Sequence, residues 1–177
     1  MTRTHTTIDS PVGELTLVAV DGMLGGIYFP GHWYMPAPEA FGAASPRGFE
    51  AAERQLAEYF AGERTGFDLD TAASGDEFQR RVWELIDRIP YGDTTTYGAM
   101  AAELGEPALA RRVGGAVGRN PLSVIVPCHR VVGKDGKLTG YAGGLERKRF
   151  LLDLEAPTLR LTAERAGAVN AGAPLSG

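Results

Sequence analysis

The sequence VIVPCHRVV, residues 124–132, is the stretch from which the rest of the chain is interpreted. It holds Cys128, the only cysteine among the 177 residues. A single thiol forms no internal disulfide, so this side chain is either a packed small hydrophobic group or a reactive one. The histidine that follows it and the arginines nearby are electropositive surroundings that favour the thiolate. The apolar residues 124–126 predict a short buried strand, and Pro127 predicts a turn at its end that carries the thiol.

The composition is that of an ordinary globular protein. With 44% apolar residues, the chain is long enough for one large domain or two small ones. No apolar run reaches the roughly 20 residues that a membrane span requires, and the N-terminus leads into no signal-peptide core. One cysteine without an export signal predicts a cytoplasmic protein.

Basic side chains are concentrated in one part of the sequence. The net charge of −4 argues against general nucleic-acid affinity, yet residues 111–150 carry nine basic and two acidic side chains, a balance of +7 that leaves −11 elsewhere. Such a region is either a solvated basic face or a surface for a polyanion. The nine are Arg111, Arg112, Arg119, Arg130, Lys134, Lys137, Arg147, Lys148 and Arg149.

The N-terminal part predicts a small sheet and one helix. Residues 13–18 and 24–29 alternate apolar and polar positions around Asp21-Gly22, which is typical of two strands joined by a turn. Residues 30–48 predict a loop whose Trp33-Tyr34-Met35 packs on the sheet, and residues 49–60 predict a helix. The small residues 71–75 predict a linker. We therefore expect an N-terminal domain over residues 1–73, a second domain over 74–156 and a disordered tail over 157–177.

The second domain predicts a series of helices. Apolar residues from Phe78 to Ile89 recur at helical spacing, with Ser74 or Asp76 as a candidate N-cap. Two short helices over residues 97–104 and 107–118 match a helix-turn-helix, although any pair of short helices has the same pattern. A last helix over residues 145–155 is expected to turn Phe150, Leu151 and Leu154 inward and Arg147, Lys148 and Arg149 elsewhere.

Further motifs give the sequence a family resemblance. The cysteine segment, RRVGGA at 111–116, Asn120-Pro121 and GYAGG at 140–144 resemble the O6-alkylguanine-DNA alkyltransferases, also called methylated-DNA–protein-cysteine methyltransferases. The resemblance covers residues 78–155 and is looser before them. It implies an α+β fold, with a ribonuclease-H-like N-terminal sheet-and-helix domain and a mainly helical, winged helix-turn-helix-like catalytic domain. It also implies DNA repair by single-turnover transfer of an alkyl group from O6-alkylguanine to Cys128, and leaves O4-alkylthymine open as a second substrate.

The resemblance implies a role for each matching residue. Cys128 is the alkyl acceptor, His129 its general base, Glu155 the partner of that base, and Tyr97 the donor to the guanine ring. Arg111 fills the gap left by the flipped base. The implied DNA-binding residues are Arg111, Tyr97, Arg112, Ala110, Gly114, Asn120 and Arg130. The implied substrate pocket is lined by Tyr141, Ala142, Gly143, Val131 and Asn120; several relatives carry serine where this chain has alanine at 142.

The resemblance further implies a monomer that binds double-stranded DNA from the minor groove, without a membrane, a cofactor or a metal. Some larger relatives bind zinc through cysteines of the N-terminal domain, and here no second cysteine exists. The residues also allow a second hypothesis, a non-catalytic helix-turn-helix regulator that binds DNA and in which Cys128 is a packed thiol.

Overall fold

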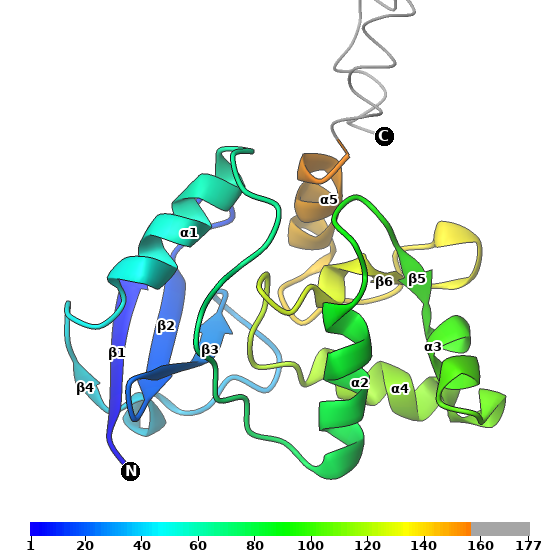
Figure 1. Cartoon of the computed structure of the whole chain (residues 1–177), viewed down its shortest axis with the longest axis horizontal. Helices are drawn as coiled ribbons and strands as arrows, with labels where there is room; N and C mark the ends of the chain where they lie inside the picture. Colours follow the sequence, from blue (N-terminus) through cyan, green and yellow to red (C-terminus); the bar gives the residue numbers. More distant parts are fainter. Residues whose placement is uncertain (157–177) are drawn as a thin grey trace, which may run out of the picture.

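A four-stranded sheet forms the N-terminal part of the computed structural model, which describes residues 1–156 (Figure 1). The strand order is β3-β2-β1-β4, with β1, β2 and β3 antiparallel and β4 parallel to β1. The strands are β1 Arg3–Ile8, β2 Leu15–Val20, β3 Met23–Tyr28 and β4 Ala43–Ala44. The predicted hairpin of β2 and β3 is confirmed, and Asp21 and Gly22 both have positive φ, as a tight two-residue hairpin turn requires. The sequence pattern missed β1, because its residues are mostly polar and either exposed or half-buried.

Alternation along β2 explains the two faces of the sheet. Leu15 and Leu17 are fully buried and point to the face that helix α1, Glu50–Phe60, covers with Leu56 and Tyr59. On the opposite face, a small cluster of Val18, Tyr28 and Phe41 lies under the 3-10 helix η1, Pro38–Phe41. The helix predicted over residues 49–60 is thus confirmed, while the predicted loop before it contains η1 and β4.

The segment predicted as a linker is hydrogen-bonded to the sheet. The Leu24 amide donates to the Asp70 carbonyl at 2.9 Å, and the Ala72 amide donates to the Leu24 carbonyl at 2.9 Å. Small residues suit this position because a Cβ atom at Gly25 would lie 3.6 Å from the Ala72 carbonyl oxygen. The domain boundary at residues 73 and 74 stays a prediction.

Short helices make up most of the C-terminal part. Asp76 and Gln79 form a capping box that begins α2, and the Thr96 hydroxyl accepts from the Ala99 amide at 3.0 Å to begin α3. The predicted helix-turn-helix corresponds to α3 and α4, which pack on each other, and α4 also packs on α2. The helices are α2 Glu77–Asp87, α3 Tyr97–Glu103, α4 Ala110–Gly118 and α5 Leu145–Leu154, with 3-10 turns η2 Pro107–Leu109, η3 Cys128–Arg130 and η4 Lys134–Gly136.

The strand predicted over residues 124–126 is wrong. These residues form turns, and Val124 has a φ of +74°, which excludes a strand. Their apolar character reflects burial in the core. The strand in this region is β6, Val131–Val132, which pairs in parallel with β5, Thr95–Thr96. That pairing sets the start of α3 beside the end of η3.

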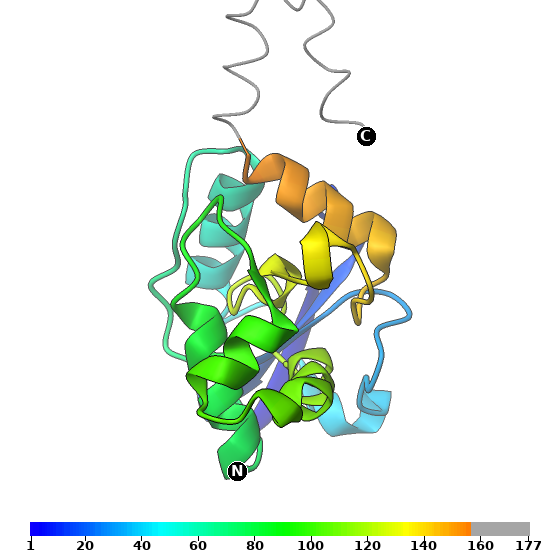
Figure 2. The same cartoon turned by 90° about the vertical axis from the view of Figure 1, so that its right-hand side faces the viewer.

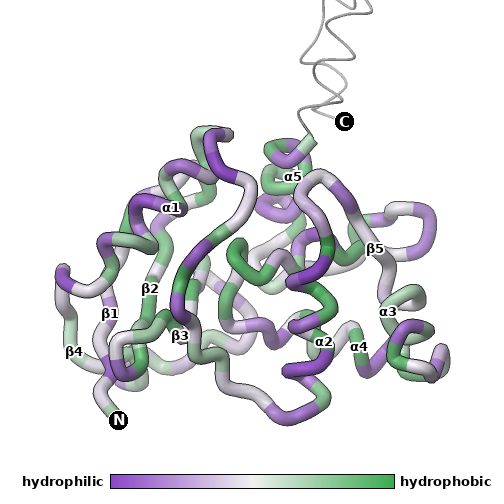
Figure 3. Tube along the Cα trace, in the orientation of Figure 1, coloured by the Kyte–Doolittle hydropathy of each residue, from purple (hydrophilic) through white to green (hydrophobic). Residues whose placement is uncertain are grey.

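Apolar residues of both parts join in one core. It includes Leu17 and Leu56 from the N-terminal part and Val82, Met100 and Leu151 from the C-terminal part. Figure 3 shows hydrophobic residues on β2 and on a segment that lies in space between the sheet and α2. Within residues 1–156, no helix is long and apolar enough to cross a membrane. The structure confirms the α+β class, and the predicted tail at 157–177 lies outside the described residues.

Candidate active site

A hydrogen-bonded turn after α4 presents Cys128. The Asn120 side chain accepts from the Leu122 amide at 3.0 Å and donates to the Val126 carbonyl at 2.8 Å, so that it closes the turn from both ends. The Cys128 amide then donates to the Val126 carbonyl at 2.7 Å. An edge of the sheet supports this turn, because the Ile27 amide donates to the Pro121 carbonyl at 2.8 Å. The thiol is therefore held in place by backbone contacts on both sides.

The thiol is buried, with only 4% of Cys128 exposed. Burial raises its pKa above the ordinary value, while the Asn120 amide, the Lys148 ammonium and the Tyr141 hydroxyl act to lower it. The arginine nearest in sequence, Arg130, is bound to Glu155, and the cation that acts on the thiol is Lys148. The resting group is a neutral thiol that needs a base before it can act as a nucleophile.

His129, the residue after the cysteine, forms a buried pair with Glu155. His129 Nε2 lies 2.7 Å from Glu155 Oε2, and both side chains are almost fully buried. Burial lowers the pKa of His129, although Glu155 acts to raise it. The other ring nitrogen, Nδ1, has no hydrogen-bond partner within residues 1–156. Because Glu155 holds the proton on Nε2, Nδ1 carries the lone pair of a neutral imidazole and can accept a proton.

Two further side chains hold the Glu155 carboxylate. Arg130 donates from Nε to Oε1 at 2.7 Å and from a terminal nitrogen to Oε2 at 3.0 Å. The Tyr59 hydroxyl donates to Oε2 at 2.5 Å. Burial acts to raise the pKa of Glu155, but the hydrogen bonds from His129, Arg130 and Tyr59 outweigh it and hold the pKa at about 2. Glu155 is thus a carboxylate at neutral pH.

Arg130, which the family resemblance implies as a DNA-binding residue, is largely buried among other groups of the site. Its guanidinium is 6% exposed and also donates to the Ile89 carbonyl at 2.6 Å. Asn120 is 2% exposed, and its amide is hydrogen-bonded inside the turn. Both residues position other groups of the site, and their implied contacts with DNA stay predictions.

The loop at residues 140–144 places Tyr141 beside the thiol and is hydrogen-bonded to both parts of the molecule. Lys148 is fully buried, and its ammonium donates to the carbonyls of Val131 at 2.7 Å and Gly140 at 2.8 Å. Burial lowers the pKa of Lys148 to about 8. The predicted pocket residues Tyr141, Ala142 and Gly143 are all buried here. The prediction for the last helix is therefore wrong at two positions, since Lys148 points inward and Phe150 is exposed.

Arg147 connects the same loop to the sheet. Its Nε donates to the Val12 carbonyl at 2.7 Å, and one terminal nitrogen donates to the Gly143 carbonyl at 2.9 Å and to the Pro30 carbonyl at 3.3 Å. The Phe29 ring lies directly under Gly143, where any side chain would collide with it. Figure 2 shows α5, which carries Arg147 and Lys148, above the segment that includes η3.

Two aromatic residues lie at the edges of this site. The Trp33 amide donates to the Ala142 carbonyl at 3.0 Å, while the Trp33 and Tyr34 side chains, which we expected to pack on the sheet, are exposed. Tyr97, the first residue of α3, is half-buried next to Gly114 of α4. Burial raises the pKa of Tyr97. A hydrogen bond with Thr139 acts to lower this pKa, and Cys128 acts to raise it.

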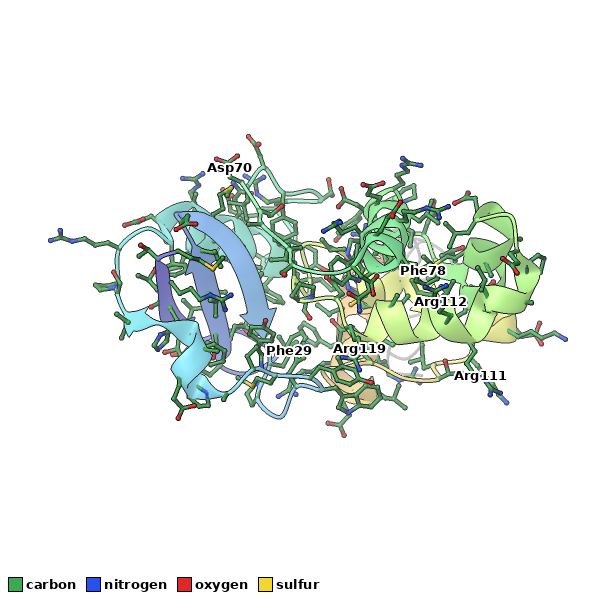
Figure 4. The ribbon with its side chains drawn as sticks, turned by 90° about the horizontal axis from the view of Figure 1, so that it is seen from below. Phe29, Asp70, Phe78, Arg111, Arg112 and Arg119 are labelled. Carbon is green, nitrogen blue, oxygen red and sulfur yellow. The ribbon has the colours of Figure 1, made fainter. Side chains whose placement is uncertain are left out.

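The arginines of α4 have different surroundings (Figure 4). Arg111 is exposed and projects away from the body of the protein. Arg112 is exposed but stacks on the Phe78 ring at 3.9 Å, and Arg119 stacks on the Tyr34 ring at 4.0 Å. The expected basic face is thus smaller than the sequence count, because Arg130 and Lys148 are buried.

Sequence reasoning missed Tyr59, Lys148 and Arg147 as parts of the site. Tyr59 has the helical spacing of a core residue, and Lys148 and Arg147 belong to a basic run that looks solvent-exposed. No local signal identifies them, because their partners lie far away in sequence.

Comparison with known proteins is consistent with this geometry. A family model described as "6-O-methylguanine DNA methyltransferase, DNA binding domain" matches residues 77–157. A methylated-DNA–protein-cysteine methyltransferase of Mycolicibacterium paratuberculosis is 49% identical over 85% of this chain and 91% of its own length. One from Methanosarcina acetivorans is 46% identical over 83% of this chain and 94% of its own. The crystal structure of Mycobacterium tuberculosis OGT in complex with DNA has a TM-score of 0.81 at 46% identity and covers 87% of this chain and 93% of that one.

The fold, the site and these matches define a DNA-binding protein whose chemistry uses a cysteine. The chain belongs to the methylated-DNA–protein-cysteine methyltransferases, which repair DNA by alkyl transfer.

Proposed function

We propose that this protein removes the alkyl group from O6-alkylguanine in duplex DNA by moving it to Cys128, once per molecule. The observation that carries the proposal is the arrangement of His129, with Nε2 held by Glu155 at 2.7 Å and Nδ1 without a partner among residues 1–156. A neutral imidazole in this tautomer can take the thiol proton, directly or through a water.

The proposed transfer is an in-line displacement at the alkyl carbon. The thiol proton passes to His129 Nδ1, the Cys128 sulfur forms a bond to the carbon, and the bond from the carbon to guanine O6 breaks. The electron pair of that bond stays with the purine, which takes up a proton from the Tyr97 hydroxyl. Glu155 stabilises the imidazolium that forms, as a buried carboxylate with a pKa of about 2 can do. The thioether has no second thiol to relieve it, because the chain holds one cysteine.

The guanine has to leave the base stack to reach a thiol that is 4% exposed. We propose that α4 approaches the duplex from the minor groove, with Ala110 and Gly114 near the backbone and Arg111 filling the space of the extruded base. Arg112 lies on the same helix and is exposed beside Phe78. Asn120, Val131, Tyr141, Ala142 and Gly143 would then surround the flipped guanine. O4-alkylthymine as a second substrate, a monomeric state and a cytoplasmic location belong to the same proposal.

The intact mass of the protein tests the proposal. After incubation with duplex DNA that contains O6-methylguanine, we expect the mass to increase by one methyl group in place of one hydrogen, and peptide mapping to place it on Cys128. An unchanged mass with retained DNA binding would instead support the helix-turn-helix regulator.

A further inference from the structure

Tyr59 brings the N-terminal part of the molecule into contact with the catalytic relay. It lies on α1, 96 residues before Glu155 in the sequence, and its hydroxyl is 2.5 Å from Glu155 Oε2. The same oxygen accepts the hydrogen bond from His129 Nε2. Tyr59 is fully buried, so this hydroxyl does not exchange its partner for bulk water. One carboxylate oxygen thus receives donors from both parts of the fold.

We propose that Tyr59 is a positioning residue for alkyl transfer, which acts through Glu155 to set the orientation and the basicity of His129. The inference rests on the proposed function, since it assigns His129 the role of base. It adds that a tyrosine of the N-terminal helix tunes this base.

Hydrogen-bond competition gives the direction of the effect. Each donor to Glu155 spreads the negative charge of the carboxylate, so less of it remains to stabilise a protonated His129. Burial and Glu155 both raise the pKa of Tyr59 far above its ordinary range, so the hydroxyl stays protonated and remains a donor. With Tyr59 in place, His129 is kept neutral and is ready to accept a proton at physiological pH.

Other charged and titratable groups of residues 1–156 also surround this relay. Glu155, Arg130 and Lys148 act on His129, and Arg130 and His129 act on Glu155. Tyr91 faces Tyr59 with ring centroids 6.3 Å apart, and Tyr59 acts to raise the pKa of Tyr141. Replacing Tyr59 by phenylalanine keeps the ring in the core, removes only the hydroxyl and leaves each of these other side chains in the protein.

The alternative is that Tyr59 is a structural core residue whose hydroxyl is hydrogen-bonded to a carboxylate without any effect on His129. Both roles predict some loss of stability in Tyr59→Phe, so stability does not separate them. The pKa of His129 does, because only a tuning role moves it. Tyr28→Phe is the matched control, since Tyr28 is also a buried tyrosine of the N-terminal part but lies in a separate cluster with Val18 and Phe41.

The experiment is an imidazole ¹⁵N NMR titration of the full chain, which contains three histidines. In Tyr59→Phe we expect the pKa of His129 to rise by about half a unit or more, as the loss of one hydrogen bond to a charged group implies. The acidic limb of the single-turnover transfer rate should move to higher pH by the same amount, and Tyr28→Phe should change neither. A His129 pKa in Tyr59→Phe equal to that of wild type and Tyr28→Phe would overturn the inference.

A second variant covers the case in which Tyr59→Phe folds poorly. Site-specific replacement of Tyr59 by 3-fluorotyrosine makes the hydroxyl a stronger donor, so we expect the pKa of His129 to fall. An unchanged or raised His129 pKa in that variant would contradict the inference. Failure of the proposed function is a separate result, because it would appear as absence of transfer by the wild-type protein.

Discussion

The N-terminal and C-terminal parts of the molecule contribute different things to one site. The groups to which we assign the chemistry, Cys128, His129, Glu155 and Tyr97, all come from the C-terminal part. The N-terminal part supplies the supports: the Tyr59 hydroxyl on Glu155, the Phe29 ring under Gly143, and backbone oxygens that accept from Arg147. The reacting groups and the groups that hold them are therefore separated along the chain but adjacent in the fold.

This difference shows why a family motif locates the chemistry and not its support. A motif records residues that are close in sequence, such as the cysteine and the histidine after it. The contacts from Tyr59 and Arg147 cross between the two parts, and they follow from how the sheet packs on the helices. Variants on each side of this boundary test whether the separation is real.

The largest expected effect is that of Cys128→Ser. A serine hydroxyl stays protonated at neutral pH and is a far weaker nucleophile than a thiolate, so transfer should be abolished. DNA binding should remain near normal, because the thiol is buried. Single-turnover transfer and a binding isotherm on the same DNA measure the two properties. Transfer that persists in the serine variant would refute Cys128 as the acceptor.

Glu155→Gln should affect both transfer and stability. It removes the partner of His129 and leaves the buried Arg130 without its carboxylate, which should cost about 3 kcal/mol of folding free energy. Because the pKa of Glu155 is depressed to about 2, its contribution to stability is present above the ordinary carboxyl pKa and is lost as the pH falls from about 5 towards 2.

Denaturant unfolding of wild type and Glu155→Gln between pH 7 and pH 2 measures this contribution. The difference in unfolding free energy should shrink as the pH falls. Glu146→Gln is the control, since Glu146 is exposed in the first turn of the same helix. A difference that stays constant with pH would mean that Glu155 is not the depressed carboxylate described here.

Arg111→Ala should slow transfer from duplex DNA by at least about tenfold, since the few kcal/mol needed to extrude a base would no longer be offset. Transfer from the free base O6-methylguanine, which has no stack to leave, should hardly change. If Arg111 only contacts phosphate, the variant would weaken binding to all sequences and lower the salt dependence by about one ion, with an unchanged rate at saturation. Saturating single-turnover rates on both substrates distinguish the two roles.

The smallest expected effect is that of Arg147→Met, which removes the hydrogen bonds from α5 to Val12, Pro30 and Gly143. We expect about 2 kcal/mol of lost stability and a severalfold slower transfer, because the loop over the thiol loses its attachment to the sheet. Arg54→Met, at an exposed position of α1, is the control for the loss of a surface arginine. Equal behaviour of the two variants would show that the sheet does not support the loop.

Much of the fold could be predicted because its signals are local. Alternation gave the β2–β3 hairpin, helical spacing gave α1 and α2, and Asp76 and Thr96 mark helix starts through their own side chains. The failures share one physical cause, which is that burial alone does not specify secondary structure. Residues 124–126 look like a strand because they are apolar, yet Asn120 closes them into turns.

The site was predictable where residues match a motif and unpredictable where charge is buried. Arg130 and Lys148 are read as surface cations from sequence, but Glu155 and two backbone carbonyls compensate for their burial. Only the tertiary structure reveals those partners. The same holds for Tyr59, because the acceptor of its hydroxyl, Glu155, lies 96 residues later in the sequence.

The central claim, that Cys128 is consumed as it accepts an alkyl group, is tested most directly by the stoichiometry of repair. Wild-type protein is incubated with an excess of duplex DNA containing O6-methylguanine, and the repaired guanine is counted against the amount of active protein. We expect the reaction to stop at one methyl group per protein molecule, because the chain has a single thiol. Continued repair beyond one methyl group per molecule would contradict this account.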